Sequence, residues 1–379
     1  MKITGIICEY NPLHLGHKKQ IDLIREVYPD GGIVCLMSGN FVQRGTPAIF
    51  DRSVRAKAAI LSGADLVLEL PVTASLCSAE GFADNGVRIL SSICDNLCFG
   101  AETADTEILL TTAQALLSPA FSLALRKQLE SGLSFPAARQ ATLNNLGINA
   151  EHLSFPNNIL AVEYCKAILS QGSKMTPFPI FRQGDYHDPV ADPQNPSATS
   201  LRQIPVDAWK PFVPAVAADC YEGASVHQLQ AGERSILTRL RTMTDAEFEA
   251  LPFSSEGLWR KLMHAAREKS SLEEIVSAVK SKRYTRTRID RMIMCAFLGL
   301  TAKDLVAPAP YVRVLAFNKK GRSILNTARE SGRFPNIGEK SEHPYQQIED
   351  RCNSLYGLFS VGTPDPPDCN SRSRVFSYE

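Results

Sequence analysis

The sequence predicts an α/β fold, with a doubly wound parallel sheet in the N-terminal part and a mainly helical C-terminal part. Over the first hundred residues, short apolar runs alternate with segments of helical spacing, and the runs at Ile3–Cys8, Gly32–Met37 and Leu66–Leu70 are almost entirely apolar. Such strands are typical of parallel sheets that helices cover on both faces. Residues 228–300, in contrast, have a mainly helical pattern.

Local signals in the same stretch predict the helices and the later strands. A helix is expected at His17–Val27 and another at Asp51–Leu61, where Asp51 is the candidate N-cap and Gly63 the stop signal. The other elements of this part are expected at residues 79–93 (helix), 96–99 (strand), 106–146 (helical), 157–169 (helix) and 177–181 (strand).

A proline-punctuated stretch, PVDAWKPFVP at residues 205–214, marks the expected domain boundary. We expect residues 1–205 to form the catalytic domain, residues 206–361 a basic and mainly helical domain, and residues 362–379 an irregular tail. Within the second domain, residues 311–330 have the pattern of a strand, a turn at Asn318-Lys-Lys-Gly321 and a helix.

Charge is unevenly distributed, although the chain of 379 residues has a net charge of only +1. Residues 260–340 hold 18 basic and 7 acidic side chains, an excess that indicates either a polyanionic partner or a solvated basic surface. No apolar run approaches the ~20 residues of a membrane helix, so no membrane partner is expected. The ten scattered cysteines lack metal-ligand spacing, which predicts reduced thiols in a cytoplasmic protein and no metal site.

The loop after the first expected strand carries the strongest chemical signal, YNPLHLGH at residues 10–17. Neither GxGxxG nor GxxxxGK[ST] occurs, which disfavours a dinucleotide-binding dehydrogenase and a P-loop kinase. The loop contains HxGH instead: Gly16 lets the backbone approach a ligand, and His14 and His17 can donate hydrogen bonds to phosphate oxygens at a helix start. At the carboxyl end of a parallel strand, this pattern predicts nucleotidyl transfer at an α-phosphate.

A second phosphate-binding element is expected late in the same domain, in SATSLR at residues 197–202. Ser197 or Thr199 is the expected N-cap of a short helix, and Arg202 supplies a guanidinium group. Alone, the segment would be an ordinary capped helix. Paired with HxGH, it predicts a triphosphate site in which Arg202 neutralises the leaving pyrophosphate.

These two motifs resemble the signature pair of the nucleotidylyltransferase superfamily, which is related to the catalytic domain of class I aminoacyl-tRNA synthetases. Longer strings are similar, in this order, to those of the bacterial tRNA(Met) cytidine acetate ligase family: EYNPLHLGH, MSGNFVQRGTPAIFDR, GADLVLELP, FGAE, PNNILAVEY, SATSLR and KRYTRTRIDR. The resemblance extends from Met1 to about Leu325. The chain departs from the family pattern at Leu13, Leu15 and Ala161, and none of these departures removes a phosphate-handling group.

The resemblance implies a nucleotidylyltransferase-like α/β fold and a two-step ligase. Acetate is activated with ATP to acetyl-adenylate, and N4 of the wobble cytidine of elongator tRNA(Met) is then acetylated, without acetyl-CoA. His14, His17 and Arg202 would be catalytic, and Mg²⁺ would accompany ATP. The implied ATP contacts are Ile7, Cys8, Glu9, Tyr10, Asn11, Pro12, Leu13, His14, Leu15, Gly16, His17, Lys18, Lys19, Gln20, Gly100, Asn157, Arg182, Ser197 and Thr199. At Asn157, a role as N-cap and a contact by Asn158 in its place stay open.

Acetate and tRNA have their own candidate residues. Arg44 and Gln43 follow the second strand and are candidates for holding acetate or a phosphate, although a surface salt bridge is an alternative role for Arg44. The KRYTRTRIDR segment would bind tRNA phosphates through a basic helix face and stack an aromatic ring on a base, unless it is merely a solvated helix. Its candidate residues are Lys282, Arg283, Tyr284, Arg286, Arg288 and Arg291.

Three other functions use the same motifs. A small-molecule adenylyltransferase of the pantetheine-phosphate or nicotinate-nucleotide type would not need a basic second domain. A catalytically inactive RNA-binding relative would not need an intact HxGH. A ligase for another acid would differ only in its substrate.

Overall fold

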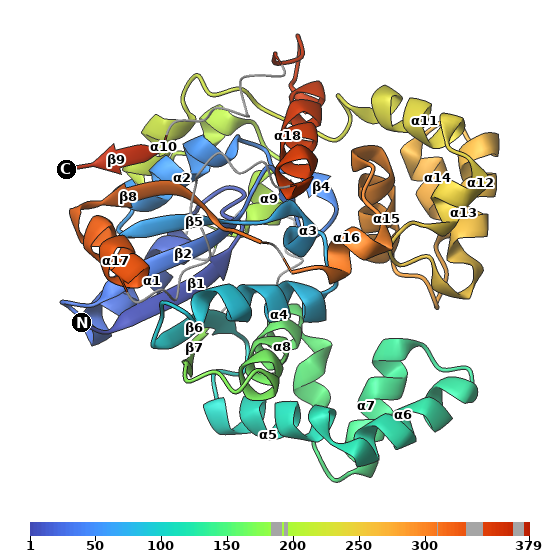
Figure 1. The fold of residues 1–379 in the computed structure, drawn as a ribbon, viewed down its shortest axis with the longest axis horizontal. Helices are drawn as coiled ribbons and strands as arrows, with labels where there is room; N and C mark the ends of the chain where they lie inside the picture. Colours follow the sequence, from blue (N-terminus) through green and yellow to red (C-terminus); the bar gives the residue numbers. More distant parts are fainter. Residues whose placement is uncertain (183–191, 193–195, 309, 331–343, 367–374) are drawn as a thin grey trace.

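The computed structural model describes residues 1–182, 192, 196–308, 310–330, 344–366 and 375–379. Its centre is a seven-stranded sheet in the order β7-β6-β1-β2-β5-β8-β9 (Figure 1). Every neighbouring pair of strands is parallel except β5 and β8. The strands are β1 (Ile3–Cys8), β2 (Gly32–Ser38), β5 (Leu66–Leu70), β6 (Asn96–Ala101), β7 (Thr176–Phe181), β8 (Arg313–Asn318) and β9 (Phe376–Tyr378). The predicted α/β class is confirmed.

Helices cover both faces of the sheet, which explains why its central strands are apolar throughout. In β2, Val34 and Leu36 face one buried core, while Ile33, Cys35 and Met37 face the other. The first core is closed by α4 (Ala79–Leu90), α8 (Pro156–Ser170) and α17 (Lys319–Glu330). The second is closed by α1 (Leu15–Val27), α2 (Arg52–Leu61) and α10 (Ala215–Tyr221).

The helical pattern over 106–146 corresponds to three helices. They are α5 (Thr106–Leu117), α6 (Pro119–Glu130) and α7 (Phe135–Asn145). Proline stands in the first turn of both α6 and α7, where its missing N–H is tolerated, so each proline starts a new helix. No single helix in the described part is long and apolar enough to cross a membrane; the bent pair α5 and α6 meets the length and composition test only when counted together.

A third hydrophobic core lies between the helices of the C-terminal half. It is formed mainly by α11 (Glu233–Thr242), α12 (Asp245–Glu249), α13 (Leu258–Glu268), α14 (Leu272–Val279), α15 (Arg286–Leu298) and α18 (Pro344–Tyr356), with α16 (Ala302–Val306) beside it. The N-terminal half contributes Phe41 and Leu76 to this core. Phe41 belongs to a small hairpin, β3 (Phe41–Val42) and β4 (Thr46–Pro47), and Leu76 follows α3 (Val72–Ser75). The hairpin therefore joins the sheet to the helical part.

The sheet continues past the predicted domain boundary at residue 205, since it includes β8 and β9. The predicted strand near residue 311 is β8, which pairs with β5; Val314 lies in the core on one face of the sheet and Leu315 in the core on the other. The expected irregular tail contains β9, which pairs with β8. The turn expected at Asn318–Gly321 is the start of α17, where Gly321 is needed for close packing: a Cβ there would lie 1.9 Å from the carbonyl oxygen of Asp65.

Candidate active site

A cavity of about 520 Å³ lies at the carboxyl ends of β1 and β6. The chain passes from β1 to β2 and β5 on one side and returns to β6 and β7 on the other, so these two strands flank the switch point at which such sheets bind ligands. The HxGH loop, the N-terminus of α8, the SATSLR segment and the β3–β4 hairpin all contribute lining residues. The two motifs predicted to bind phosphate thus meet in one cavity.

The charge of the lining favours an anionic ligand. One carboxylate, that of Glu9, lines the cavity within the described part of the chain. Five cationic side chains line it: Lys19, Arg44, Arg182, Arg202 and Arg291. Such an excess of positive charge raises the local concentration of polyanions such as nucleotides. No group of three His, Cys, Asp or Glu side chains suited to a metal ion was found among the described residues.

The HxGH loop fixes the tautomer of both histidines. His14 is the N-cap of α1, and its Nδ1 accepts a hydrogen bond from the Gly16 N–H at 3.1 Å. Nδ1 of His17 accepts one from the His14 N–H at 3.3 Å. These backbone donors assign the proton of each neutral ring to Nε2. Nε2 of His14 is buried without a hydrogen-bond partner in the described structure, so a ligand oxygen would supply the acceptor it lacks.

Both imidazoles are neutral at pH 7. Burial, followed by the nearby Arg182 guanidinium, lowers the pKa of His17 to about 3. Burial also lowers the pKa of His14 well below its ordinary value, and the adjacent His17, Arg182 and Arg202 add to that shift. The histidines therefore act as neutral hydrogen-bond donors, and the positive charge in the cavity comes from the arginines and Lys19.

We expect both rings to remain Nε2–H tautomers at pH 5.5, where a histidine in a flexible peptide is mostly protonated. Because the pKa of His17 lies at about 3 in the folded chain and at 6.5 ordinarily, the native state binds fewer protons in this window. The stability contributed by the neutral ring is thus lost as the pH falls below about 6.5. Imidazole ¹⁵N spectra of the histidine-labelled protein between pH 5 and 8 test this, with a histidine peptide as reference. Imidazolium shifts for His17 at pH 5.5 would contradict it.

Ser197, and not Thr199, caps the SATSLR helix. Ser197 Oγ accepts a hydrogen bond from the Ser200 N–H at 3.0 Å at the start of α9 (Ala198–Leu201). Thr199 lines the cavity, and its Oγ1 lies 3.4 Å from the donating Nη2 of Arg202. Nη1 of Arg202 donates to the carbonyl oxygen of Asn11 at 2.5 Å. Arg202 thus ties the late motif directly to the HxGH loop.

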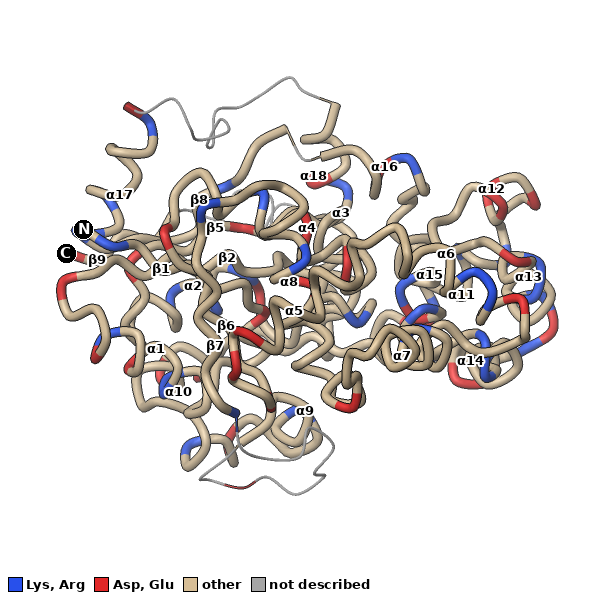
Figure 2. Tube along the Cα trace, turned by 90° about the horizontal axis from the view of Figure 1, so that it is seen from below, with Lys and Arg blue, Asp and Glu red and all other residues tan. Residues whose placement is uncertain are grey.

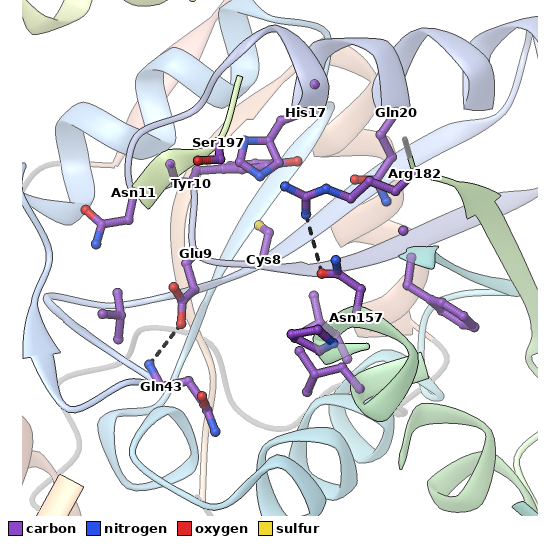
Figure 3. A pocket seen from close by; sticks show the side chains of 18 of the residues that line it. Cys8, Glu9, Tyr10, Asn11, His17, Gln20, Gln43, Asn157, Arg182 and Ser197 are labelled. Carbon is purple, nitrogen blue, oxygen red and sulfur yellow. Dashed lines mark hydrogen bonds between the residues drawn. The ribbon is translucent and has the colours of Figure 1, made fainter. Parts of the chain in front are cut away.

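Gly100, Asn157 and Arg182 meet at another part of the cavity wall. Nη1 of Arg182 donates to Oδ1 of Asn157 at 3.4 Å (Figure 3). Gly100 lies beneath Arg182, since a Cβ at Gly100 would be 3.7 Å from its Cδ. Asn157 lines the cavity, whereas Asn158 is fully buried and its Oδ1 accepts a hydrogen bond from the Thr103 N–H. Of the two candidates, Asn157 is therefore the one that a ligand can reach.

Glu102, which holds Asn157 in place, is a residue that sequence reasoning missed. Its carboxylate accepts hydrogen bonds from Nδ2 of Asn157 at 2.7 Å and from the Asn158 N–H at 2.9 Å. A carboxylate is favourable there because the first N–H groups of α8 are unpaired within the helix. The only sequence signal was its place in the string FGAE, directly after β6.

Glu9 and Gln43 lie across the cavity from this group. Figure 3 shows Glu9 and Gln43 on one side and Arg182 and Asn157 on the other, with Cys8 between them in this view. The backbone N–H of Gln43 donates to Glu9 Oε1 at 2.9 Å, and its side-chain Nε2 donates to the Cys77 carbonyl at 3.3 Å. Arg44 also lines the cavity.

Most of the predicted ATP contacts line the cavity, and four do not: Pro12, Leu13, Leu15 and Lys18. The apolar residues anchor the loop instead. Leu13 is fully buried, and its N–H donates to the Tyr221 hydroxyl at 3.0 Å. The ammonium group of Lys18 pairs with Asp22, one turn further along α1. The loop was predicted as a continuous contact, but some of its side chains hold it in place instead of lining the cavity.

The KRYTRTRIDR segment divides between surface and interior. Lys282, Arg283 and Arg286 are exposed. Tyr284 is buried, and its hydroxyl donates to the Glu256 carbonyl at 2.7 Å. The prediction that Tyr284 stacks on a base is therefore wrong, because its ring is already packed inside the helical part.

Two arginines of the same segment are also engaged. Arg288 is partly buried, donates to the Phe253 carbonyl at 2.9 Å and lies over the Tyr284 ring. Arg291 is buried, lies over the Phe253 ring and lines the cavity. The prediction that Arg291 belongs to an exposed tRNA-binding face is wrong, since α15 turns this side chain inward.

The switch-point cavity and its paired HxGH and SATSLR elements define a nucleotidyl transferase of the HIGH class. A family model described as HIGH Nucleotidyl Transferase matches residues 1–363. The tRNA(Met) cytidine acetate ligase of Clostridium novyi is 37% identical over 356 residues, covering 88% of this chain and 89% of the relative. That of Clostridium tetani is 35% identical over 367 residues, covering 89% and 90%. The chain belongs to the tRNA(Met) cytidine acetate ligase family, which confirms the resemblance seen in its sequence.

Solved structures agree with this assignment. Apo Thermotoga maritima TmcAL has a TM-score of 0.91, and the same protein bound with alpha-thio ATP has a TM-score of 0.87. In both comparisons the identity is 28% and each chain is covered completely.

Proposed function

We propose that this chain is an ATP-dependent ligase that activates acetate as acetyl-adenylate and acetylates N4 of the wobble cytidine of elongator tRNA(Met). The observation that carries the proposal is the meeting of HxGH and SATSLR in one cationic cavity, through the Arg202 hydrogen bond to Asn11. The acetyl group comes from free acetate and not from acetyl-CoA, and the enzyme acts in the cytoplasm.

In the first step an acetate oxygen attacks the α-phosphorus of ATP in line, and the bond to pyrophosphate breaks. His14 and His17 donate from Nε2 to the α-phosphate oxygens. Arg202 and Thr199 hold the pyrophosphate, and Gly100, Asn157 and Arg182 hold the adenosine. Mg²⁺ would enter with ATP, held by phosphate oxygens, and neutralise the developing charge.

In the second step the cytosine amino group attacks the acetyl carbonyl, adenylate leaves and N4 loses a proton. The amine is a weak nucleophile because its lone pair is delocalised into the ring, so positioning of a flipped base dominates. Glu9 is placed to accept the proton, since its carboxylate lines the cavity.

Positively charged side chains of the helical part form the tRNA-binding surface. Figure 2 shows basic residues along α11, α13 and α15. Arg283 and Arg286 are paired with Glu256 and Glu273 at exposed positions, where such pairs contribute little and phosphates can replace the carboxylates. Binding through such a surface weakens steeply with salt. Its exposed basic residues include Arg260, Lys261, Arg267, Lys282, Arg283 and Arg286.

The proposal is tested by ATP–pyrophosphate exchange with and without acetate, followed by assay of N4-acetylcytidine in tRNA(Met). We expect exchange to require acetate and acetylation to require the tRNA. Exchange without acetate would indicate a small-molecule adenylyltransferase, and no exchange would indicate an RNA-binding relative. Comparison of acetate with propionate and amino acids identifies the acid.

A further inference from the structure

Arg291 is a buried cation whose charge has no acidic partner in the described structure. Only 8% of the residue surface is exposed, and its Nε is buried with no hydrogen-bond partner among the described residues. The neighbouring carboxylate, Asp290, is turned toward Arg286, with its Oδ2 3.6 Å from Arg286 Nε. A guanidinium remains charged in proteins, so this group is left incompletely solvated.

Arg291 lies on the side of the cavity that is lined by Gln43 and Arg44 of the β3–β4 hairpin. The turn of the β3–β4 hairpin packs on its backbone: a Cβ at Gly45 would lie 2.5 Å from the Arg291 nitrogen, and Gly45 has a φ of +80°. Gln43 and Arg44, in the same turn, line the cavity together with Arg291. Burial lowers the pKa of the Arg291 guanidinium, and the nearby Asp290 carboxylate is among the groups that oppose this shift. Cys77, which lies near Arg291, bears the carbonyl that accepts from Gln43, so Arg291 and Gln43 share one neighbourhood.

A small carboxylate suits this neighbourhood better than a phosphate. Three apolar residues, Val42, Ala79 and Phe82, line the cavity beside Gln43 and Cys77 in the chain and offer contacts to a methyl group. The phosphates of ATP have other partners, namely His14 and His17 of the HxGH loop and Arg202 of the SATSLR segment. An attacking acid must approach from the side opposite to the leaving pyrophosphate. In Figure 3, Gln43 lies well away from Ser197, which begins the pyrophosphate segment.

We infer that Arg291 binds the carboxylate of acetate, so that the helical part of the chain completes the active site. The inference rests on the proposed function and changes the residue expected to hold acetate, since Arg44 is less buried than Arg291 and has interactions of its own. A guanidinium kept from water binds a carboxylate more strongly than an exposed one does, because little solvent competes for either charge. The energetic cost of burying Arg291 is recovered when acetate binds.

The test is acetate-dependent pyrophosphate exchange by the full-length Arg291→Met and Arg291→Lys variants. We expect Arg291→Met to raise the acetate KM about 30-fold or more, because the bound carboxylate loses its buried positive partner. Arg291→Lys should raise the acetate KM less, because it keeps a positive charge. Dissociation constants for ATP and for tRNA(Met), measured separately, should stay within about twofold. The melting temperature of Arg291→Met should not fall, because methionine removes an uncompensated buried charge. If Arg291 had only a structural role, Arg291→Met would lower the melting temperature and leave the acetate KM unchanged.

The matched control is Arg351→Met, whose guanidinium donates to the Leu298 and Gly299 carbonyls at the other end of α15. Its acetate KM should be unchanged. An unchanged acetate KM in Arg291→Met overturns the inference, as does a parallel loss of ATP affinity, which would make Arg291 a phosphate ligand. Loss of tRNA affinity alone, with an unchanged acetate KM, also overturns it. If the wild type itself shows no exchange in the presence of acetate, the proposed function is overturned. That outcome differs from one in which the wild type exchanges and only the prediction for the variant fails. If Arg291→Met does not fold, the acetate KM of Arg291→Lys decides.

Discussion

Replacement of His17 by Gln is expected to slow formation of acetyl-adenylate by about 10²- to 10³-fold. The imidazole of His17 is aimed by a hydrogen bond that its Nδ1 accepts from the His14 N–H, which leaves Nε2–H as a fixed donor. A Gln amide can donate, but it lacks the rigid ring that stacks on His14 with 3.8 Å between centroids. A donor that must reorganise during the reaction stabilises the transition state less than one already in place.

The measurement is single-turnover adenylate formation at saturating ATP and acetate, with the ATP dissociation constant determined separately. Since the donor acts mainly on charge that develops during displacement, the rate should fall far more than the affinity. His264→Gln is the control, because His264 is exposed on α13 and does not line the cavity. If the rate held and only the ATP affinity fell, His17 would be a binding residue and not a catalytic one.

The parts of the fold that sequence predicts well are those in which one segment contains its own signal. Strands β1, β2 and β5 are buried on both faces, so their apolar runs could be read directly. Asp51 caps α2 as predicted, because an N-cap bonds to N–H groups only two or three residues away. The HxGH loop was identified for the same reason: its glycine and both histidines act within four residues.

The parts that sequence could not predict depend on contacts between distant segments. The inward direction of Arg291 is set by packing of α15 against the β3–β4 hairpin, more than 240 positions earlier in the chain. A run of basic residues cannot show which of its members a helix buries. The role of Glu102 likewise depends on α8 arriving beside the end of β6. β8 returns to the sheet after the helices α11 to α16, and no local pattern predicts that pairing.

Replacement of Arg202 by Met is expected to lower the rate of pyrophosphate exchange by about 10²- to 10³-fold and to raise the pyrophosphate KM. Two effects of the side chain combine in this result. Its charge offsets that of the leaving pyrophosphate, and its hydrogen bond to the Asn11 carbonyl holds the SATSLR segment against the HxGH loop. Exchange rates at varied pyrophosphate, with ATP and acetate saturating, measure the combined loss.

Arg202→Lys separates the two effects. A lysine ammonium keeps the charge but presents it as a compact group, and cannot reproduce the planar fork with which Arg202 reaches both Asn11 and Thr199. If charge dominates, Arg202→Lys should recover most of the rate; if the tie between the two motifs dominates, it should be nearly as slow as Arg202→Met. We expect an intermediate rate, because lysine keeps the charge of Arg202 but loses the paired contacts that its guanidinium makes. Arg88→Met, at an exposed pair with Asp84 on α4, is the control and should leave exchange unchanged. Wild-type pyrophosphate KM and rate in Arg202→Met would show that the meeting of the two motifs has no part in catalysis.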